Sequence, residues 1–109
     1  MDLVDYQTAA LCTALYPNQG DNFVYPALGL AGEAGEVADK LKKVIRDNGG
    51  TLTDPVRESV AKELGDVLWY VAVLAHELSY DLDTIAKNNL DKLASRMERG
   101  VITGSGDNR

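Results

Sequence analysis

Three turn-forming segments divide the chain into four stretches whose apolar residues recur at helical spacing. The interruptions lie at 17–22, at the Asn-Gly-Gly of 48–50, and near the Ser-Tyr pair of 79–80. Glycine and asparagine accept the left-handed conformation in which helices end, and proline removes a backbone donor. No stretch alternates apolar and polar residues as a half-buried strand does. The pattern therefore predicts an all-α fold.

The four expected helices share ordinary start and stop signals. They run from about Asp5 to Tyr16, from Pro26 to Asp47, from Pro55 to near Ser79, and from a cap at Asp81 to a stop at Gly100. A chain of 109 residues is long enough for one domain and too short for two of ordinary size. We expect a single domain over 1–109, a four-helix antiparallel bundle-type subunit, with a flexible glycine-rich tail over 99–109.

Charge and composition exclude several classes of protein. The formal net charge is −6, from 17 acidic against 11 basic residues, which argues against a nucleic-acid polymer as partner. One cysteine and one histidine allow neither an intramolecular disulfide nor a zinc site of those residues within one chain. No apolar run approaches the roughly 18 residues of a membrane span. The first residues, Met1 to Asp5, do not form the basic segment with which a signal peptide starts. We expect no membrane association and a cytoplasmic location.

Two acidic pairs interrupt the second and third expected helices. Glu33 and Glu36 form one pair, and Glu63 and Asp66 form the other. At ~100° per residue, the two members of a pair lie about 60° apart and share one helix face. Glu63 also borders the apolar stripe of its helix. Either pair alone has a simpler interpretation as part of a solvated helix face.

Four carboxylates facing each other across two packed helices would repel one another unless cations or protons compensated. Ligands that are all oxygen favour a hard ion, Mg²⁺ with Mn²⁺ as a substitute, over the iron of bundles that use histidine. The sequence therefore predicts a metal site formed by Glu33, Glu36, Glu63 and Asp66.

Glycines accompany both acidic pairs. Gly29, Gly32 and Gly35 recur at every third position of the second helix, and Gly65 precedes Asp66. Each costs roughly 1 kcal/mol relative to alanine inside a helix. Close approach of two helices and space for a ligand are both compatible with this pattern.

Several basic residues are candidates for binding an anion beside that metal. Lys40 and Lys43 lie within about 60° of the acidic face of the second helix, although Glu36 with Lys40 and Asp39 with Lys43 could also form ordinary i,i+4 ion pairs.

On the fourth helix, Asn89, Lys92 and Arg96 share a stripe beside the apolar face. Arginine can bind phosphate oxygens through two N–H groups while lysine acts as a point charge, although an exposed polar face is the alternative. Trp69 is a candidate for stacking on a base, with core packing as its alternative.

Three motifs, in order, resemble the MazG-like branch of the all-α nucleoside triphosphate pyrophosphohydrolases. They are Gly-Leu-Ala-Gly-Glu33-Ala-Gly-Glu36-Val, then Lys-Glu63-Leu-Gly-Asp66-Val-Leu-Trp-Tyr, then Asn89-x-x-Lys92-Leu-x-x-Arg96. The resemblance extends over nearly the whole chain, and both acidic pairs in order make it specific.

The resemblance implies hydrolysis of a (deoxy)nucleoside triphosphate to the monophosphate and pyrophosphate. It implies that the four acidic positions hold Mg²⁺, that a metal-activated water attacks the α phosphate, and that basic residues of the last helix bind phosphate. It also implies that subunits assemble into a homodimer or a dimer of dimers whose helices complete the bundle.

Two non-catalytic alternatives stay open. A bundle that only mediates protein association needs no acidic pairs, and divalent metal would not change its melting temperature. A divalent-metal-binding protein would bind the ion without turnover. Both differ from the enzyme in whether a nucleoside triphosphate is hydrolysed.

Overall fold

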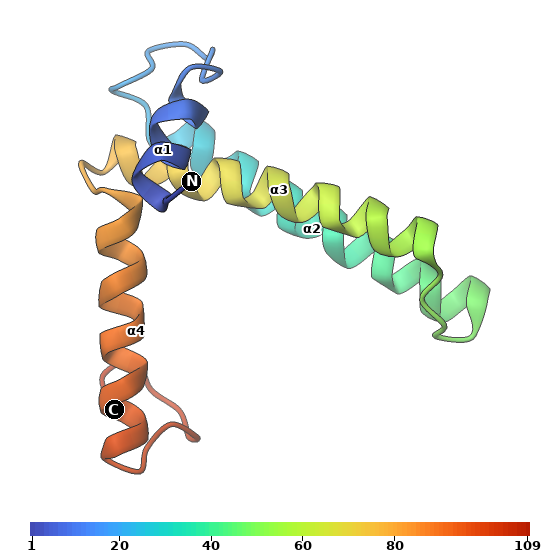
Figure 1. The fold of residues 1–109 in the computed structure, drawn as a ribbon. Helices are drawn as coiled ribbons and strands as arrows, with labels where there is room; N and C mark the ends of the chain where they lie inside the picture. The colour runs from blue at the N-terminus through green and yellow to red at the C-terminus, as the bar shows by residue number, and fades with distance from the viewer.

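The computed structural model describes residues 1–109 and contains four α-helices and no strand. The helices are α1 (Leu3–Leu11), α2 (Val24–Asn48), α3 (Asp54–Glu77) and α4 (Leu82–Glu98), as Figure 1 shows. The all-α prediction is confirmed. No helix combines the length and the hydropathy needed to span a bilayer.

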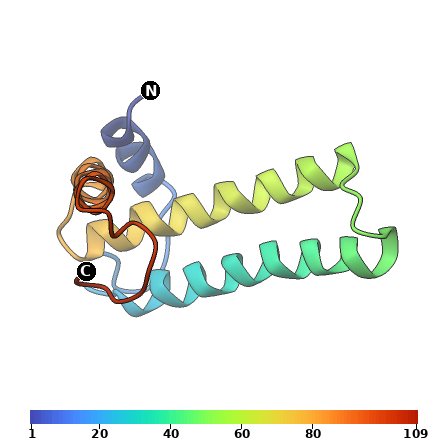
Figure 2. The same ribbon diagram turned by 90° about the horizontal axis from the view of Figure 1, so that it is seen from below.

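The two long helices, α2 and α3, pack side by side as an antiparallel hairpin (Figure 2). Gly49 ends α2 in the left-handed conformation, with φ 59°, and its N–H donates to the carbonyl of Val44. Pro55 lies in the first turn of α3, where its missing N–H has no helical partner to lose. The bounds of this hairpin therefore follow the predicted ones within a few residues.

The short helix α1 covers the junction between α3 and α4. The side-chain amide of Gln7 is buried there and donates to the carbonyls of Ala72 and Tyr80, both at 3.1 Å. Its oxygen accepts the backbone N–H of Leu82 at 2.9 Å. Gln7 thus joins the end of α3 to the start of α4. The small core near this junction consists of alanine, valine, leucine and tyrosine side chains.

Only the hairpin has the antiparallel packing predicted for the whole subunit. Helix α4 packs against α1 and α3 but not against α2, and it runs away from the hairpin at a steep angle (Figure 1). Within one chain the four helices therefore do not close into a bundle, because α4 packs against no part of α2 and leads away from the hairpin (Figure 1).

The first helix ends earlier than predicted. It was expected to run from Asp5 to Tyr16, but it begins at Leu3, where the Asp2 carboxylate accepts the N–H of Asp5 at 2.8 Å, and it ends at Leu11. The backbone then forms short turns, and Tyr16 leaves the helix to bind a carboxylate far along the chain.

One side of the hairpin leaves large apolar side chains exposed. Only 11 of 109 residues are buried, whereas Ile45 is 73% exposed, Leu64 55% and Leu68 41%. A groove of about 310 Å³ runs between the helices on this side, lined by Leu41, Leu52, Arg57, Val60, Ala61 and Leu64. A single chain therefore leaves much of its apolar helix surface without a partner.

Candidate metal centre

Three of the four predicted carboxylates meet between α2 and α3. One oxygen each from Glu33, Glu63 and Asp66 lies within 4.8 Å of the others. The helix hairpin creates this cluster, because Glu33 on α2 and the Glu63/Asp66 pair on α3 lie on the faces that the two helices turn toward each other. Glu33 and Glu63 are half-buried and Asp66 is exposed, so the cluster is open to solvent on one side.

The carboxylates of the cluster lie close enough together that the ionisation of one affects the pKa of another. A hydrogen bond with Glu63 raises the pKa of Glu33, and partial burial and the charges of Asp66, Glu63 and Glu36 raise it further. The pKa of Glu63 is lowered, first by the ammonium group of Lys40 and then by the hydrogen bond with Glu33. The ammonium charge of Lys40 thus offsets part of the repulsion among the carboxylates.

Lys40 takes part in this cluster from α2. Its ammonium group donates to Glu63 at 2.8 Å and to the hydroxyl of Ser59 at 2.6 Å. The ion pair therefore spans the two helices, in place of the i,i+4 pair with Glu36 that the spacing allowed. Lys40 is the cation nearest the carboxylates on the two helices that form the cluster.

The fourth predicted ligand, Glu36, is exposed and lies outside the group of three oxygens. Its charge still contributes to the raised pKa of Glu33, so it lies near the cluster without joining it. Its role as a metal ligand stays a prediction.

Tyr70 lies beside the cluster and next to Tyr25. The ring of Tyr70 lies so close to Gly29 that a Cβ atom at that position would overlap it. Burial, the neighbouring Tyr25, and the charges of Glu33 and Asp66 raise the pKa of Tyr70. The spacing indicates this contact, because Tyr70 follows Asp66 by four residues and Glu33 follows Gly29 by four. Each pair therefore shares one helix face.

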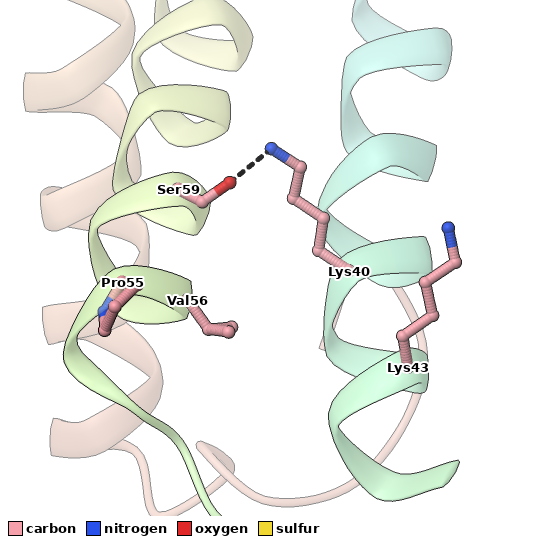
Figure 3. A pocket seen from close by; sticks show the side chains of 5 residues that line it. All are labelled: Lys40, Lys43, Pro55, Val56 and Ser59. Atoms are coloured by element: carbon pink, nitrogen blue, oxygen red, sulfur yellow. Dashed lines mark hydrogen bonds between the residues drawn. The ribbon is translucent and has the colours of Figure 1, made fainter. Parts of the chain in front are cut away.

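A pocket of about 290 Å³ lies next to Lys40, toward the loop that connects the two helices (Figure 3). It is lined by Lys40, Lys43, Pro55, Val56 and Ser59. The ammonium group of Lys40 points across the gap to Ser59, whereas that of Lys43 points away and pairs with Asp39 at 2.8 Å (Figure 3). The Asp39–Lys43 pair is the i,i+4 ion pair that the sequence spacing allowed. Hydrogen bonds from Lys43 and Lys42 lower the pKa of Asp39 to about 2.

Trp69 packs against the core. Its indole N–H donates to the hydroxyl of Thr13 at 2.9 Å, and its ring contacts both groups of buried side chains. Core packing was the alternative weighed for this residue, and a contact with a base stays a prediction.

The structure does not bring the three predicted residues of α4 to the carboxylates within one chain. Asn89 and Lys92 are exposed on a helix that leads away from the hairpin (Figure 1). Arg96 is only 8% exposed, and one of its terminal N–H groups donates to the carbonyl of Asp107 at 2.7 Å. The tail at 99–109 thus turns back over Arg96, and its predicted flexibility stays a prediction.

The donor set fits a hard divalent cation. All three groups are carboxylates, they come from two packed helices, and their oxygens are close enough for one ion to contact all three. The raised pKa of Glu33 and the ion pair of Lys40 both reflect an excess of negative charge that a bound cation would offset. Mg²⁺ or Mn²⁺ would satisfy the same charges.

Comparisons with known proteins agree with this arrangement. Residues 26–101, which include α3, α4 and nearly all of α2, match the MazG nucleotide pyrophosphohydrolase domain. The chain is 52% identical, over 109 aligned residues, to the Gene 37 protein of Mycobacterium phage L5, and the alignment covers 95% of this chain and 96% of that protein. No solved structure matches the chain significantly.

Proposed function

The chain belongs to the MazG nucleotide pyrophosphohydrolase family, and we propose that it hydrolyses a (deoxy)nucleoside triphosphate to the monophosphate and pyrophosphate in a reaction that requires Mg²⁺. The observation that carries this proposal is the meeting of Glu33, Glu63 and Asp66 between two packed helices. A family domain alone supports a nucleotide substrate, whereas the carboxylates also support the metal that this chemistry needs.

The proposed roles of the side chains follow from their charges and places. Glu33, Glu63 and Asp66, with Glu36 as a fourth ligand, would hold Mg²⁺ (or Mn²⁺). Once bound, the ion would polarise the α phosphate and lower the pKa of the attacking water. Lys40, which already lies at the cluster, would bind phosphate oxygens after releasing Glu63.

The other predicted residues are proposed to complete the substrate site. Lys43 lines the pocket beside Lys40, so it would add positive charge to the path of the β and γ phosphates. Asn89, Lys92 and Arg96 are proposed to bind phosphate from α4, and Trp69 to contact the base.

A product analysis tests this function. Purified protein is incubated with each ribonucleoside and deoxynucleoside triphosphate, with Mg²⁺ or with EDTA, and the nucleotide products are separated. We expect monophosphate and pyrophosphate in the presence of Mg²⁺ only. Diphosphate and orthophosphate would contradict the proposed bond cleavage. Metal-dependent stabilisation without any product would favour a non-catalytic metal-binding protein. The absence of both product and metal-dependent stabilisation would favour a bundle that only mediates association.

We also propose that the chain works as a homodimer or a dimer of dimers. The apolar groove along the hairpin is exposed in one chain, and helices of a second copy would cover it. In an assembly, α4 of one chain could also reach the acidic cluster of another chain, because α4 leads away from the cluster of its own chain. A second subunit would thereby complete the bundle.

Light scattering is expected to show a particle of at least twice the mass of one chain at micromolar concentration. Leu64→Gln should lower that mass, because leucine burial at an interface stabilises association by roughly 1.5–3 kcal/mol per side chain. Lys62→Gln is the matched control, since Lys62 lies on another side of the same helix and is 76% exposed. A monomeric wild type, or equal masses for both variants, would contradict the proposed interface.

A further inference from the structure

Glu77, at the C-terminal end of α3, binds three donors from the segment between α1 and α2. The hydroxyl of Tyr16 donates to Oε1, the N–H of Gly20 donates to the same oxygen at 2.9 Å, and the N–H of Asn22 donates to Oε2 at 3.1 Å. Burial alone would raise the pKa of Glu77, but these hydrogen bonds outweigh it and lower the pKa. One ionised carboxylate therefore fixes the path of this segment.

The segment held by Glu77 leads into the start of α2. The side-chain oxygen of Asn22 accepts the N–H of Tyr25 at 3.1 Å, and its amide group donates to the carbonyl of Pro17 at 2.8 Å. The ring of Tyr16 stacks on that of Tyr25, with centroids 4.6 Å apart and planes inclined by 9°. Both the backbone and the ring of Tyr25 are therefore held, in two different ways, by groups bound to Glu77.

Tyr25 continues this chain of contacts to the acidic cluster. Tyr25, Gly29 and Glu33 follow one another at intervals of four on one face of α2. The ring of Tyr70 fills the space that Gly29 leaves, next to Tyr25 and near the charges of Glu33 and Asp66. A displacement of Tyr25 would therefore change the wall of the cluster.

We propose that Glu77 is a positioning residue for the pyrophosphohydrolase site: through Tyr16 and Tyr25 it holds Tyr70 at the wall of the acidic cluster, where the nucleotide binds. This inference rests on the proposed function. Glu77 lies eleven residues after Asp66, roughly 16 Å along the helix axis at 1.5 Å per residue, so it acts through the tyrosines rather than on the substrate.

Two variants break the same link at different atoms. Glu77→Gln keeps the size of the side chain but removes its charge and turns an NH₂ group toward a donor. Tyr16→Phe removes the hydroxyl and keeps the stacked ring. Each should lower kcat/KM for the preferred triphosphate about tenfold, mainly through KM, which corresponds to ~1.4 kcal/mol. Mn²⁺ affinity without nucleotide should stay within about twofold of the wild-type value.

The double variant separates a shared link from two independent effects. If Glu77 and Tyr16 act together, the double variant loses no more kcat/KM than Glu77→Gln alone. Glu58→Gln is the matched control, because Glu58 lies on the same helix, is 75% exposed, and has only a 3.9 Å ion pair with Lys62. It should leave kcat/KM unchanged.

A second measurement needs no nucleotide. In a protein with ring-labelled tyrosine, the NMR signal of Tyr70 is identified from its loss in Tyr70→Phe among the five tyrosines of the chain. We expect the signal to shift in Glu77→Gln and in Tyr16→Phe and to stay in place in Glu58→Gln. If the wild type hydrolyses no triphosphate, the proposed function fails, but this signal still decides whether Glu77 positions Tyr70.

Three results would overturn the inference. The first is an unmoved Tyr70 signal in Glu77→Gln. The second, in an active enzyme, is a kcat/KM equal to that of the wild type in both single variants. The third is a loss of activity that comes with an equal loss of Mn²⁺ affinity and a large drop in Tm, because that pattern describes damage to the fold rather than positioning.

Discussion

Glu63→Gln is expected to abolish Mg²⁺-dependent turnover while leaving the helices intact. Glu63 is the partner of both Glu33 and Lys40, so it lies at the centre of the cluster. Glutamine keeps the shape of the side chain but lacks the negative charge that a hard ion requires. We expect a loss of at least about a hundredfold in kcat/KM, worth ~2.7 kcal/mol, with unchanged helical circular dichroism.

The controls for this variant lie on the same two helices. Glu58→Gln removes an exposed carboxylate of α3 and should keep wild-type turnover. Binding of Mn²⁺, followed by electron paramagnetic resonance, should weaken in Glu63→Gln and not in Glu58→Gln. Near wild-type turnover in Glu63→Gln would refute the metal site.

Glu36→Gln decides how many carboxylates the site uses. The spacing predicts four ligands, whereas the structure brings three together and leaves Glu36 exposed beside them. A hundredfold loss in Glu36→Gln would mean that metal binding draws in the fourth carboxylate. Unchanged turnover would restrict the site to Glu33, Glu63 and Asp66.

The parts of the fold that local chemistry determines could be predicted from the sequence. Pro55 and the Asn-Gly-Gly segment set the ends of the hairpin, because their backbone preferences act within a few residues. The end of α1 could not be predicted in this way. Tyr16 leaves the helix for Glu77, which lies 61 positions away, and no local pattern encodes that contact.

The same distinction explains the candidate site. The i,i+3 spacing places Glu63 and Asp66 on one face of α3, and the hairpin then brings that face to Glu33. Spacing alone could not show that Lys40 pairs with Glu63 across the helices rather than with Glu36 along its own. That outcome depends on how the two helices are set against each other.

The structure also separates the two explanations for the glycines of the expected helices. The sequence left helix contact and ligand space as equal explanations. Gly29 serves contact, because the ring of Tyr70 occupies the place of a side chain. Gly32, Gly35 and Gly65 have nothing within 4 Å of a Cβ position, so in one chain they border open space.

Lys40→Gln is expected to change metal affinity and turnover in opposite directions. The ammonium group of Lys40 holds Glu63 at 2.8 Å and therefore competes with a divalent ion for the same carboxylate. Without this cation, Mn²⁺ should bind at least about threefold more tightly in the absence of nucleotide, a gain of ~0.65 kcal/mol. A residue that merely stabilised the cluster would lose metal affinity when removed.

Turnover should fall in the same variant. If Lys40 releases Glu63 when the metal binds and then faces the phosphates, its loss removes a charge that the transition state needs. We expect kcat/KM to drop at least about tenfold, or ~1.4 kcal/mol, at saturating Mg²⁺. Lys42→Gln is the matched control, because Lys42 lies on the same helix and pairs with Asp39 but lines neither the cluster nor the pocket.

The pair of measurements distinguishes the possible roles of this lysine. Tighter Mn²⁺ binding with unchanged turnover would make Lys40 a counter-charge that substrate never meets, and phosphate binding would then fall to Lys43 or to α4. Weaker Mn²⁺ binding would contradict the competition itself, because a cation 2.8 Å from a ligand oxygen raises the free energy of a second cation at the same carboxylate. Opposite changes in Lys40→Gln, with neither change in Lys42→Gln, would assign the exchange of partners to Lys40.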